Sequence, residues 1–294
     1  MRISERVDLA QRCYFRIGGP ADYFAAVAGP EELARVLAFA RRRGLSTFLL
    51  GAGSNLFFDD RGFRGLVVRM ADRRLEIAPD RRSVLAGAGW GLPALVRRLA
   101  RCHLGGLTFL GNIPGTLGGA VVGNAGCYGR SLGEVVEKVV ICDRQRGRVV
   151  EVEPAWCGFA YRRSRLQEEG GPIVVAVRLR LEGTDGAAVL VELEEELARR
   201  RSMHPQDQAC AGSFFKNPPG QSAWQLIDRA GLREAREGAA ALSPKHPNFI
   251  VNRGGATSEQ VRTLAARVQR QVEAATGIRL EPEVRYVSPT GVGP

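Results

Sequence analysis

The sequence feature that most limits the fold is a glycine-rich stretch at residues 111–129. Seven of its nineteen residues are glycine and none is charged. Glycine permits positive φ and close approach of a foreign atom, and consecutive amides in a turn form a concave donor site for phosphate or carbonyl oxygens. Asn112, Thr116, Asn124 and Tyr128 add hydrogen-bonding groups of fixed direction. The stretch therefore predicts a ligand site built on main chain, with a tightly packed helical segment as the alternative.

A second glycine loop, Gly51-Ala52-Gly53-Ser54-Asn55, follows an apolar run at residues 46–50. Because that run follows a helical pattern, we expect these glycines at the carboxyl end of a strand, where phosphate sites are common. The loop alone is a weak signal, since it lacks the third glycine of a dinucleotide fingerprint and the lysine of a P-loop. The two glycine loops together favour a phosphate-bearing ligand much more strongly.

The chain has 294 residues, enough for two or three lobes, and its 45% apolar and 25% charged residues are ordinary for a globular protein. No apolar run is long enough to span a bilayer, and the amino terminus lacks the apolar region of a signal peptide. The six cysteines show neither C-x-x-C pairing nor a histidine at ligand spacing. We therefore expect a cytoplasmic protein with reduced thiols, no metal and no membrane contact.

The net charge of +11 comes almost entirely from arginine, because the chain has only three lysines. A basic surface can serve nucleic acid or phosphorylated small molecules. Here the arginines are scattered rather than interleaved with aromatic residues, so most are expected on solvated faces. We expect a monomer that binds small molecules and no nucleic acid.

Periodicity divides the chain into three successive regions. Residues 1–70 contain a helix at 30–43 with Leu33, Val36, Leu37 and Ala40 on its buried face, between strands, which predicts a βαβ lobe. Residues 71–202 are rich in short strands, at 73–77, 83–88, 135–142, 148–152 and 173–181, with helices at 92–103 and 189–201; this indicates a mostly antiparallel sheet. Residues 203–294 contain a loop at 212–219, helices at 222–230 and 257–276, a strand at 249–252 and a closing strand at 278–287.

Six spaced motifs follow one another along nearly the whole chain. They are Gly51-Ala52-Gly53-Ser54-Asn55, Ile113-Pro114-Gly115-Thr116-x-Gly118-Gly119-Ala120, Asn124-Ala125-Gly126, Tyr161-Arg162-x-Ser164, Gly212-Ser213-Phe214-Phe215-Lys216-Asn217-Pro218 and Pro282-Glu283-Val284-Arg285. In this order and spacing they resemble the motifs of the UDP-N-acetylenolpyruvoylglucosamine reductase (MurB) family.

The resemblance implies an α+β fold class. A two-lobed FAD-binding domain of the PCMH or vanillyl-alcohol-oxidase type, with lobes at 1–70 and 71–202, would be followed by a smaller α+β substrate-binding domain at 203–294. Between Arg162 and the helix at 189–201 the chain is short and has no additional tyrosine. It therefore resembles the shorter subtype of the family, which lacks a tyrosine-bearing loop over the substrate.

The resemblance also implies FAD as cofactor, held between the two glycine loops. We expect non-covalent FAD, because the Gly51 loop has no histidine to which it could be tethered. The implied cofactor contacts are Gly51, Ala52, Gly53, Ser54, Asn55, Asn112, Ile113, Pro114, Gly115, Thr116, Gly118, Gly119, Gly123, Asn124 and Ala125. The implied substrate contacts are Tyr161, Lys216 and Asn217, although turn geometry and loop solubility are alternatives for the last two.

Ser213 is the first of three candidate catalytic residues. It lies in a polar loop held by glycine and prolines, with Phe214 and Phe215 beneath it. A serine after glycine is often a helix cap or turn residue, and no G-x-S-x-G elbow surrounds Ser213, so a hydrolase nucleophile is not expected. The resemblance implies that Ser213 donates a proton to a substrate carbanion.

Arg162 and Glu283 are the other two candidate catalytic residues. In an extended segment Arg162 and Arg163 would point to opposite sides, so either could face a cleft, and the resemblance assigns Arg162. Its guanidinium would bind the enolpyruvyl carboxylate and stabilise charge that develops on it. Glu281 and Glu283 would share one side of a strand, and the resemblance selects Glu283, acting protonated or as partner of Arg162.

The implied reaction is the NADPH-dependent reduction of UDP-N-acetylglucosamine enolpyruvate to UDP-N-acetylmuramate in peptidoglycan precursor synthesis. Flavin N5 would transfer hydride to C3 of the enolpyruvyl group, and Ser213 would protonate C2. Two alternatives are another FAD-dependent oxidase of the same fold and a nucleotide- or nucleic-acid-binding module that uses the positive charge. Flavin bound to the purified protein would exclude the second.

Overall fold

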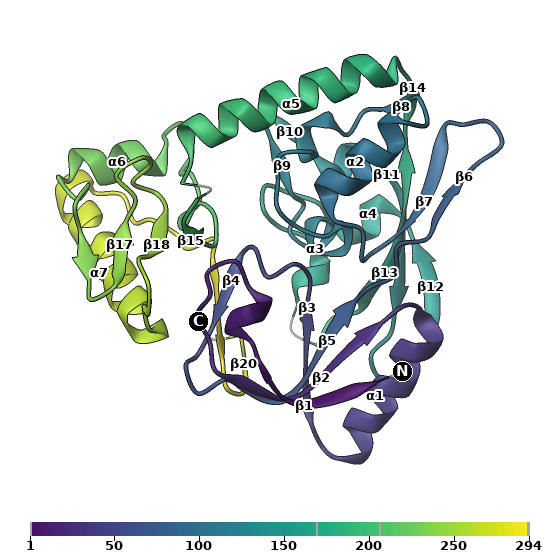
Figure 1. Cartoon of the computed structure of the whole chain (residues 1–294), viewed down its shortest axis with the longest axis horizontal. Coiled ribbons are helices and arrows are strands. Elements are labelled where there is room, and N and C mark those ends of the chain that lie inside the picture. Colours follow the sequence, from purple (N-terminus) through teal and green to yellow (C-terminus); the bar gives the residue numbers. More distant parts are fainter. Residues whose placement is uncertain (1, 169, 206, 293–294) are drawn as a thin grey trace. The chain divides into compact units, whose positions relative to one another are not determined.

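The computed structural model describes residues 2–168, 170–205 and 207–292 (Figure 1). The chain forms two compact units, and each is described by itself. Unit 1 comprises Met1–Ser4, Phe24–Ala52 and Val67–Arg199, and unit 2 comprises Glu5–Tyr23, Gly53–Leu66 and Arg200–Pro294.

Unit 1 contains both helices and strands. Its helices are α1 (Pro30–Arg42), α2 (Leu92–Ala100), α3 (Leu117–Val122), α4 (Pro154–Cys157) and most of α5 (Gly186–Met203), with 3-10 turns at Thr108–Leu110, Leu132–Glu134 and Arg165–Gln167. Its strands are β3 (Ser46–Leu50), β6 (Leu75–Ile77), β7 (Ser83–Gly87), β8 (Leu104–Gly105), β9 (Gly126–Cys127), β10 (Arg130–Ser131), β11 (Val136–Cys142), β12 (Val149–Val152), β13 (Ile173–Arg180) and β14 (Glu182–Gly183). Three further strands, β1 (Ile3–Asp8), β2 (Pro20–Val27) and β5 (Phe63–Met70), form a sheet with β3 in the order β1-β2-β5-β3.

A five-stranded sheet forms the core of unit 1. Its order is β12-β11-β13-β7-β6, and its neighbouring strands are antiparallel, which confirms the antiparallel sheet expected from the sequence. The central strand β13 is buried without interruption from Ile173 to Val177. A central strand covered on both faces carries such an unbroken apolar run. Here α3 packs against β13 and α4 packs against β11.

Helix α1 ends one residue before its predicted end and buries the predicted face. Proline begins it, Glu31 and Glu32 lie in its first turn, and Arg41 and Arg42 lie in its last, so charges complement the helix dipole at both ends. Its buried residues are the four predicted ones, Leu33, Val36, Leu37 and Ala40.

The glycine-rich stretch contains a helix. Thr116 caps α3, because its Oγ1 accepts a hydrogen bond from the Gly119 N–H. Gly118 is buried, and a Cβ there would lie 2.9 Å from the Cβ of Ala88. The alternative of a tightly packed helical segment is therefore correct for residues 117–122, while the stretch on either side of them is not α-helical.

Two predicted helix boundaries differ from the structure by three residues, more than the others do. Helix α2 ends at Ala100 rather than at His103, because His103 adopts a φ of +55° and turns the chain. Helix α5 begins at Gly186, three residues before its predicted start. A Cβ at Gly186 would lie 2.0 Å from the Ala100 carbonyl oxygen, so its lack of a side chain allows the helix to start there.

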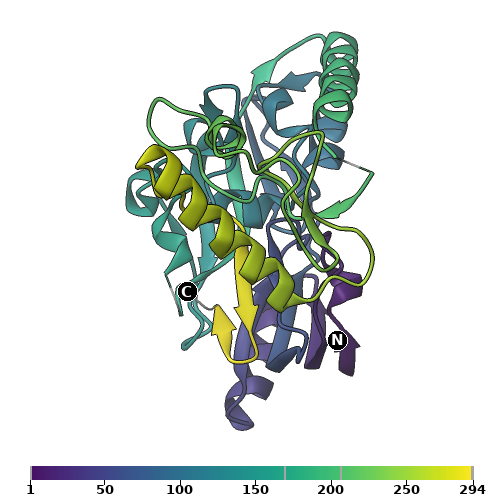
Figure 2. The ribbon, with the colours of Figure 1, turned by 90° about the vertical axis from the view of Figure 1, so that its left-hand side faces the viewer.

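Unit 2 contains a second antiparallel sheet beside two helices. Its helices are α6 (Ala223–Arg229) and α7 (Ser258–Thr276), with a 3-10 turn at Ala10–Arg12, and its strands are β4 (Leu56–Phe58), β15 (Ala209–Cys210), β16 (Arg236–Glu237), β17 (Ala240–Leu242), β18 (Ile250–Asn252), β19 (Arg285–Ser288) and β20 (Gly291–Val292). One sheet has the order β15-β18-β17-β16, and another has the order β20-β19-β4 with β19 parallel to β4. Helix α7, in yellow in Figure 2, packs against α6, β16 and β17. The predicted stripe of Val261, Leu264, Ala265, Val268 and Val272 is buried.

The predicted closing strand at 278–287 is wrong for residues 278–284. Strand β19 begins at Arg285, and the segment before it makes a single bridge, between Pro282 and Phe215. Proline has no N–H to donate to a ladder, so pairing at this position stays local.

The amino terminus of α7 generates a stability prediction. Thr257 Oγ1 accepts a hydrogen bond from the Gln260 N–H, and the Gln260 side chain accepts from the Thr257 N–H. Thr257→Ala removes one half of this capping box, so we expect the free energy of unfolding to fall by about 1 kcal/mol. Urea denaturation measures the change, and Thr257→Ser, which keeps the hydroxyl, should stay close to the unmodified protein. Equal losses in both variants would contradict the role of the hydroxyl.

Candidate active site

In unit 2 the structure brings Ser213 and Glu283 together through main-chain pairing. The Phe214 carbonyl accepts hydrogen bonds from the N–H groups of Glu283 (2.8 Å) and Val284 (3.3 Å). The Lys216 N–H donates to the Glu281 carbonyl at 2.9 Å. Ser213 and Glu283 are both partly exposed, whereas Phe214 and Phe215 are buried beneath the loop as predicted. The two candidate residues thus lie on neighbouring segments over an apolar base.

The end of the Gly51 loop joins the same cluster in unit 2. The Asn55 Nδ2 donates to the Glu283 carbonyl at 3.2 Å, and the Arg285 N–H donates to the Asn55 carbonyl at 3.1 Å. Gly53 is buried at φ +69°, where a Cβ would lie 2.4 Å from the Arg12 carbonyl oxygen. Gly53 therefore lets the loop pass close to the 3-10 turn, and Asn55 holds the Glu283 segment.

Lys216 and Asn217, predicted to contact substrate, already have partners in unit 2. The Lys216 ammonium is paired with the Glu281 carboxylate. The Asn217 Oδ1 accepts a hydrogen bond from the Ala223 N–H at the start of α6, at 3.0 Å. Both side chains thus have structural partners within unit 2, and their contact with substrate stays a prediction.

In unit 1, Arg162 lies in a tight turn, so the condition of an extended segment, under which Arg162 and Arg163 would point to opposite sides, is not met. Ala160 and Arg163 exchange two main-chain hydrogen bonds of 3.0 and 3.1 Å, and Arg162 has a φ of +55°. A side chain other than glycine in this left-handed region is strained, and such strain is common at functional sites. The Arg162 Nη1 donates to the Gly126 carbonyl at 2.9 Å, and its guanidinium lies 5.2 Å from the centroid of the exposed Tyr161 ring.

The glycine-rich stretch at 111–129 supports the Arg162 turn within unit 1. The Asn124 Nδ2 donates to the Ala160 carbonyl, and its Oδ1 accepts from the Gly133 N–H, both at 2.9 Å. The buried Ser164 hydroxyl donates to the Val122 carbonyl at 2.6 Å. The Asn124 side chain, predicted as a cofactor contact, thus holds the Arg162 turn, and its contact with cofactor stays a prediction.

The two glycine loops also meet in unit 1. A Cβ at Gly51 would lie 2.7 Å from the Thr116 Oγ1, so the loops pass each other at a distance that only glycine permits. Gly119 is exposed, and Ala52, Ile113, Pro114, Gly115, Gly123 and Ala125 are partly exposed. Large side chains therefore do not cover the main chain around this contact. This fits a cofactor whose phosphates accept hydrogen bonds from main-chain amides.

Asn112 differs from these exposed positions because it is buried. Its Nδ2 lies 3.5 Å from both the Tyr128 hydroxyl and a Glu196 carboxylate oxygen on α5. This contact ties the start of the glycine-rich stretch to α5 within unit 1. Its predicted contact with cofactor is not tested by this geometry.

Asn248 is a residue that the sequence does not single out. It is 3% exposed, and its main-chain and side-chain amide groups bind the backbone of Phe214 and Phe215. An asparagine between a proline and a strand carries no local signal for such a contact. Only the tertiary structure shows that Asn248 contacts this loop.

A histidine pair lies beside Asn248 in unit 2. The His246 Nδ1 accepts from the Asn248 N–H at 3.3 Å, and the rings of His246 and His204 are 5.2 Å apart. His204 stacks on Phe249 with a centroid distance of 5.1 Å, and its Nδ1 is buried without a hydrogen-bond partner among the described residues. Burial, with the positive charge of Arg200 as a further cause, lowers the pKa of His204 to about 4. Both imidazoles thus pack against Phe249 beside the turn that carries Asn248.

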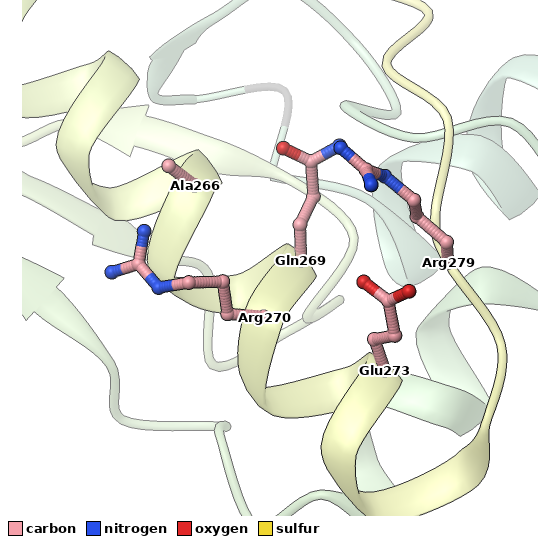
Figure 3. A pocket seen from close by; sticks show the side chains of 5 residues that line it. All are labelled: Ala266, Gln269, Arg270, Glu273 and Arg279. Carbon is pink, nitrogen blue, oxygen red and sulfur yellow. The ribbon is translucent and has the colours of Figure 1, made fainter.

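Two surface cavities lie away from these loops. Figure 3 shows one of about 260 Å³, lined by Ala266, Gln269, Arg270 and Glu273 of α7 and by Arg279. The other, of about 570 Å³, is lined by Asp80, Arg82, Glu137, Arg180, Leu181, Glu182 and Gly183. Neither includes a predicted site residue, so the candidate site rests on the hydrogen-bonded loops.

The six cysteines are free thiols, as expected. Across residues 2–168, 170–205 and 207–292, no group of three or more metal-ligating side chains could hold an ion. In the same described ranges, no helix is long and apolar enough to cross a membrane.

Comparison with known proteins connects this geometry to a family. A model of the C-terminal domain of UDP-N-acetylenolpyruvoylglucosamine reductase matches residues 204–287, and a model described as an FAD binding domain matches residues 21–153. The UDP-N-acetylenolpyruvoylglucosamine reductase 2 of Symbiobacterium thermophilum is 44% identical over 284 residues, which cover 97% of this chain and 92% of that protein. The chain belongs to the UDP-N-acetylenolpyruvoylglucosamine reductase family.

The chain is also similar to other members of the reductase family. The reductase of Heliobacterium modesticaldum is 42% identical over 288 residues, which cover 96% of this chain and 90% of that protein. The crystal structure of the Thermus caldophilus reductase (MurB) superposes with a TM-score of 0.82 at 36% identity, covering 97% of this chain and 99% of that one. The predicted α+β fold with an FAD-binding domain is confirmed, and the chain is an FAD-dependent oxidoreductase of peptidoglycan synthesis.

The contact between Gly51 and Thr116 generates a prediction about cofactor affinity. In Gly51→Ala the new methyl group must displace the Thr116 hydroxyl, and overpacking of this kind costs ~1–3 kcal/mol. We expect FAD to dissociate with a constant raised about tenfold, the equivalent of ~1.4 kcal/mol. Fluorescence of released FAD during dilution measures it. Gly183→Ala is the matched control, because a Cβ there meets no atom within 4 Å; an equal effect in both variants would contradict the prediction.

The histidine pair generates a prediction about acid stability. The pKa of His204 in the folded state, about 4, lies below its ordinary value of ~6.5, so its contribution to stability is complete above pH ~6.5 and is lost as the pH falls toward 4. His204→Phe keeps a ring against Phe249 and should unfold with a shallower pH dependence in that window. Urea denaturation at several pH values checks this. His103→Asn, which replaces an exposed histidine, should leave the slope unchanged; a slope unchanged in His204→Phe would contradict the prediction.

Proposed function

We propose that this member of the family reduces UDP-N-acetylglucosamine enolpyruvate to UDP-N-acetylmuramate, with NADPH as the electron donor. The observation that carries the proposal is the hydrogen-bonded pairing of the Ser213 loop with the Glu283 segment. A proton donor and a carboxyl group on neighbouring hydrogen-bonded segments over an apolar base suit the protonation of a carbanion beside a carboxylate. When bound, FAD would supply the hydride, taken from NADPH and passed to C3 of the enolpyruvyl group.

Ser213 would protonate C2 of the substrate. Its hydroxyl is partly exposed on a loop whose following residues are held on two sides by main-chain hydrogen bonds. A general acid acts only when it lies within hydrogen-bond reach of the atom that receives the proton. The fixed main chain at Phe214 and Phe215 is therefore suited to hold the hydroxyl in one place.

Arg162 would bind the enolpyruvyl carboxylate, and Glu283 would stabilise the enediolate or partner Arg162. A guanidinium with two N–H groups directed at a carboxylate forms a bidentate pair that gains strength as negative charge develops. The hydrogen bond from Nη1 to Gly126 restrains the Arg162 side chain within unit 1. A restrained donor costs less reorganisation during reaction than a freely rotating one.

Lys216, Asn217 and Tyr161 would contact the UDP-sugar. Lys216 would exchange the Glu281 carboxylate for a phosphate oxygen, because both are anionic acceptors of the same ammonium. Asn217 would use its Nδ2, since its Oδ1 is bonded to the Ala223 N–H. The exposed Tyr161 ring would offer an apolar face.

The proposal also assigns each ligand to a part of the chain. Lobes at 1–70 and 71–202 would hold FAD through the named loop residues, and residues 203–294 would bind the UDP-sugar. The match of an FAD-binding model to 21–153 and of a reductase C-terminal model to 204–287 supports this order. We further propose non-covalent FAD, the shorter subtype, a cytoplasmic monomer and no nucleic-acid partner.

The two half-reactions test the proposal directly. Flavin absorbance should bleach when NADPH is added without oxygen and return when UDP-N-acetylglucosamine enolpyruvate follows. Ser213→Ala should slow the return by about 10²- to 10⁴-fold and leave the bleaching unchanged, because only the second step needs a proton at C2. Ser222→Ala, which precedes α6, is the control within the same segment. Return of the flavin bands only with oxygen would show that the substrate is wrong.

A further inference from the structure

Asn248 makes three hydrogen bonds to two consecutive residues of the Ser213 loop. The Phe214 N–H donates to the Asn248 carbonyl at 2.7 Å, the Phe215 N–H donates to Oδ1 at 3.0 Å, and Nδ2 donates to the Phe215 carbonyl at 2.8 Å. The Asn248 side chain therefore pairs with Phe215 as a peptide group pairs across two strands. Asn248 and Phe215 are 3% and 1% exposed, so water does not share these bonds.

Few side chains could replace this amide. An aspartate keeps the acceptor for the Phe215 N–H but places a second acceptor against the Phe215 carbonyl, and it carries a charge. A leucine has a similar shape and leaves both Phe215 groups buried without these bonds. The position thus requires a donor and an acceptor on one short planar group.

The opposite edge of the same segment holds Glu283. The Phe214 carbonyl accepts from the Glu283 N–H at 2.8 Å, while its N–H donates to Asn248. Phe214 therefore lies between Asn248 on one side and Glu283 on the other. Ser213 directly precedes Phe214, so its Cα position depends on the same bonds.

Asn248 is itself held by a turn. Its N–H donates to His246 Nδ1 at 3.3 Å, the Phe249 N–H donates to the His246 carbonyl at 3.0 Å, and the Ser243 N–H donates to the Phe249 carbonyl at 2.8 Å. The turn leads into β18 of the unit 2 sheet. The turn that precedes β18 thus carries Asn248 to the loop.

We propose that Asn248 is a positioning residue that fixes the main chain of Phe214 and Phe215 and thereby places Ser213 beside Glu283 for the protonation step. The inference rests on the proposed role of Ser213 and adds to it. Asn248 acts through the loop and does not touch the substrate. Small displacements of a catalytic group cost large factors in rate, so loss of the amide should affect protonation far more than binding.

The first test separates the two half-reactions of the FAD-loaded protein. Asn248→Asp should slow the return of the flavin bands with UDP-N-acetylglucosamine enolpyruvate by about 10- to 100-fold and leave bleaching by NADPH within about twofold. The matched control is Asn252→Asp, four residues on in β18. Asn252 Oδ1 accepts from the Gly254 and Ala256 N–H groups and its Nδ2 donates to the Phe15 carbonyl, so it also loses a donor without facing Ser213. The control should leave the ratio of the two rates unchanged.

A second test asks whether Asn248 acts through Ser213. The double variant Ser213→Ala with Asn248→Asp should be no slower in the flavin return than Ser213→Ala alone. Without the Ser213 hydroxyl, a shift of the loop no longer displaces a proton donor. A general loosening of the fold would instead multiply the two effects. Multiplied effects would overturn the positioning role.

A third test needs no cofactor. In the flavin-free protein, amide hydrogen exchange at Phe215 and Glu283 should accelerate in Asn248→Leu and Asn248→Asp but not in Asn252→Asp. Unchanged exchange at Phe215 in both Asn248 variants would overturn the inference.

The outcomes distinguish a failure of the proposed Ser213 role from a failure of the Asn248 inference. If Ser213→Ala does not slow the flavin return, the proposed role of Ser213 fails and the Asn248 inference fails with it. If Ser213→Ala slows the return while Asn248→Asp does not, or slows bleaching equally, only the Asn248 inference is overturned. A selective slowing in Asn248→Asp, absent from Asn252→Asp and not added to that of Ser213→Ala, supports it.

Discussion

The pairing of the Phe214–Phe215 main chain on both of its edges is the interaction on which the candidate active site most depends. Asn248 holds one edge, and the Glu283 segment holds the other. The segment is buried, so each lost bond would leave a polar group without water and cost about 1–3 kcal/mol. Because Ser213 precedes this segment and the Glu283 N–H is hydrogen-bonded to it, the positions of both candidate residues depend on the same main chain.

The glycine-rich stretch meets two physical demands at once. Gly118 permits α3 to pack close to Ala88, which is a structural requirement of the unit 1 core. Gly51 permits the other glycine loop to pass the Thr116 hydroxyl, which leaves open main chain for a cofactor. The packed-helix interpretation holds for residues 117–122, while the ligand site stays a prediction for the main chain on either side of them.

Several polar side chains that the motifs mark as ligand contacts also have a structural partner. Asn124 supports the turn that carries Arg162, Asn217 bonds to the start of α6, and Asn55 holds the Glu283 segment. An amide offers two donors and two acceptor positions, so it can bond to the protein with one group and to a ligand with another. A motif residue can accordingly be required both for folding and for binding.

The sequence by itself determined the family, the α+β class, the extents of α1 and α7 and their buried faces. These features follow from local periodicity, capping residues and spaced motifs, which are properties of neighbouring positions. Only the tertiary structure decided that Arg162 lies in a turn, that the closing strand begins at Arg285, and that Asn248 binds a loop 33 residues away. The bond between Asn55 and Glu283 joins residues 228 positions apart. Hydrogen bonds of this kind form between segments that meet only after folding, so local sequence patterns do not predict them.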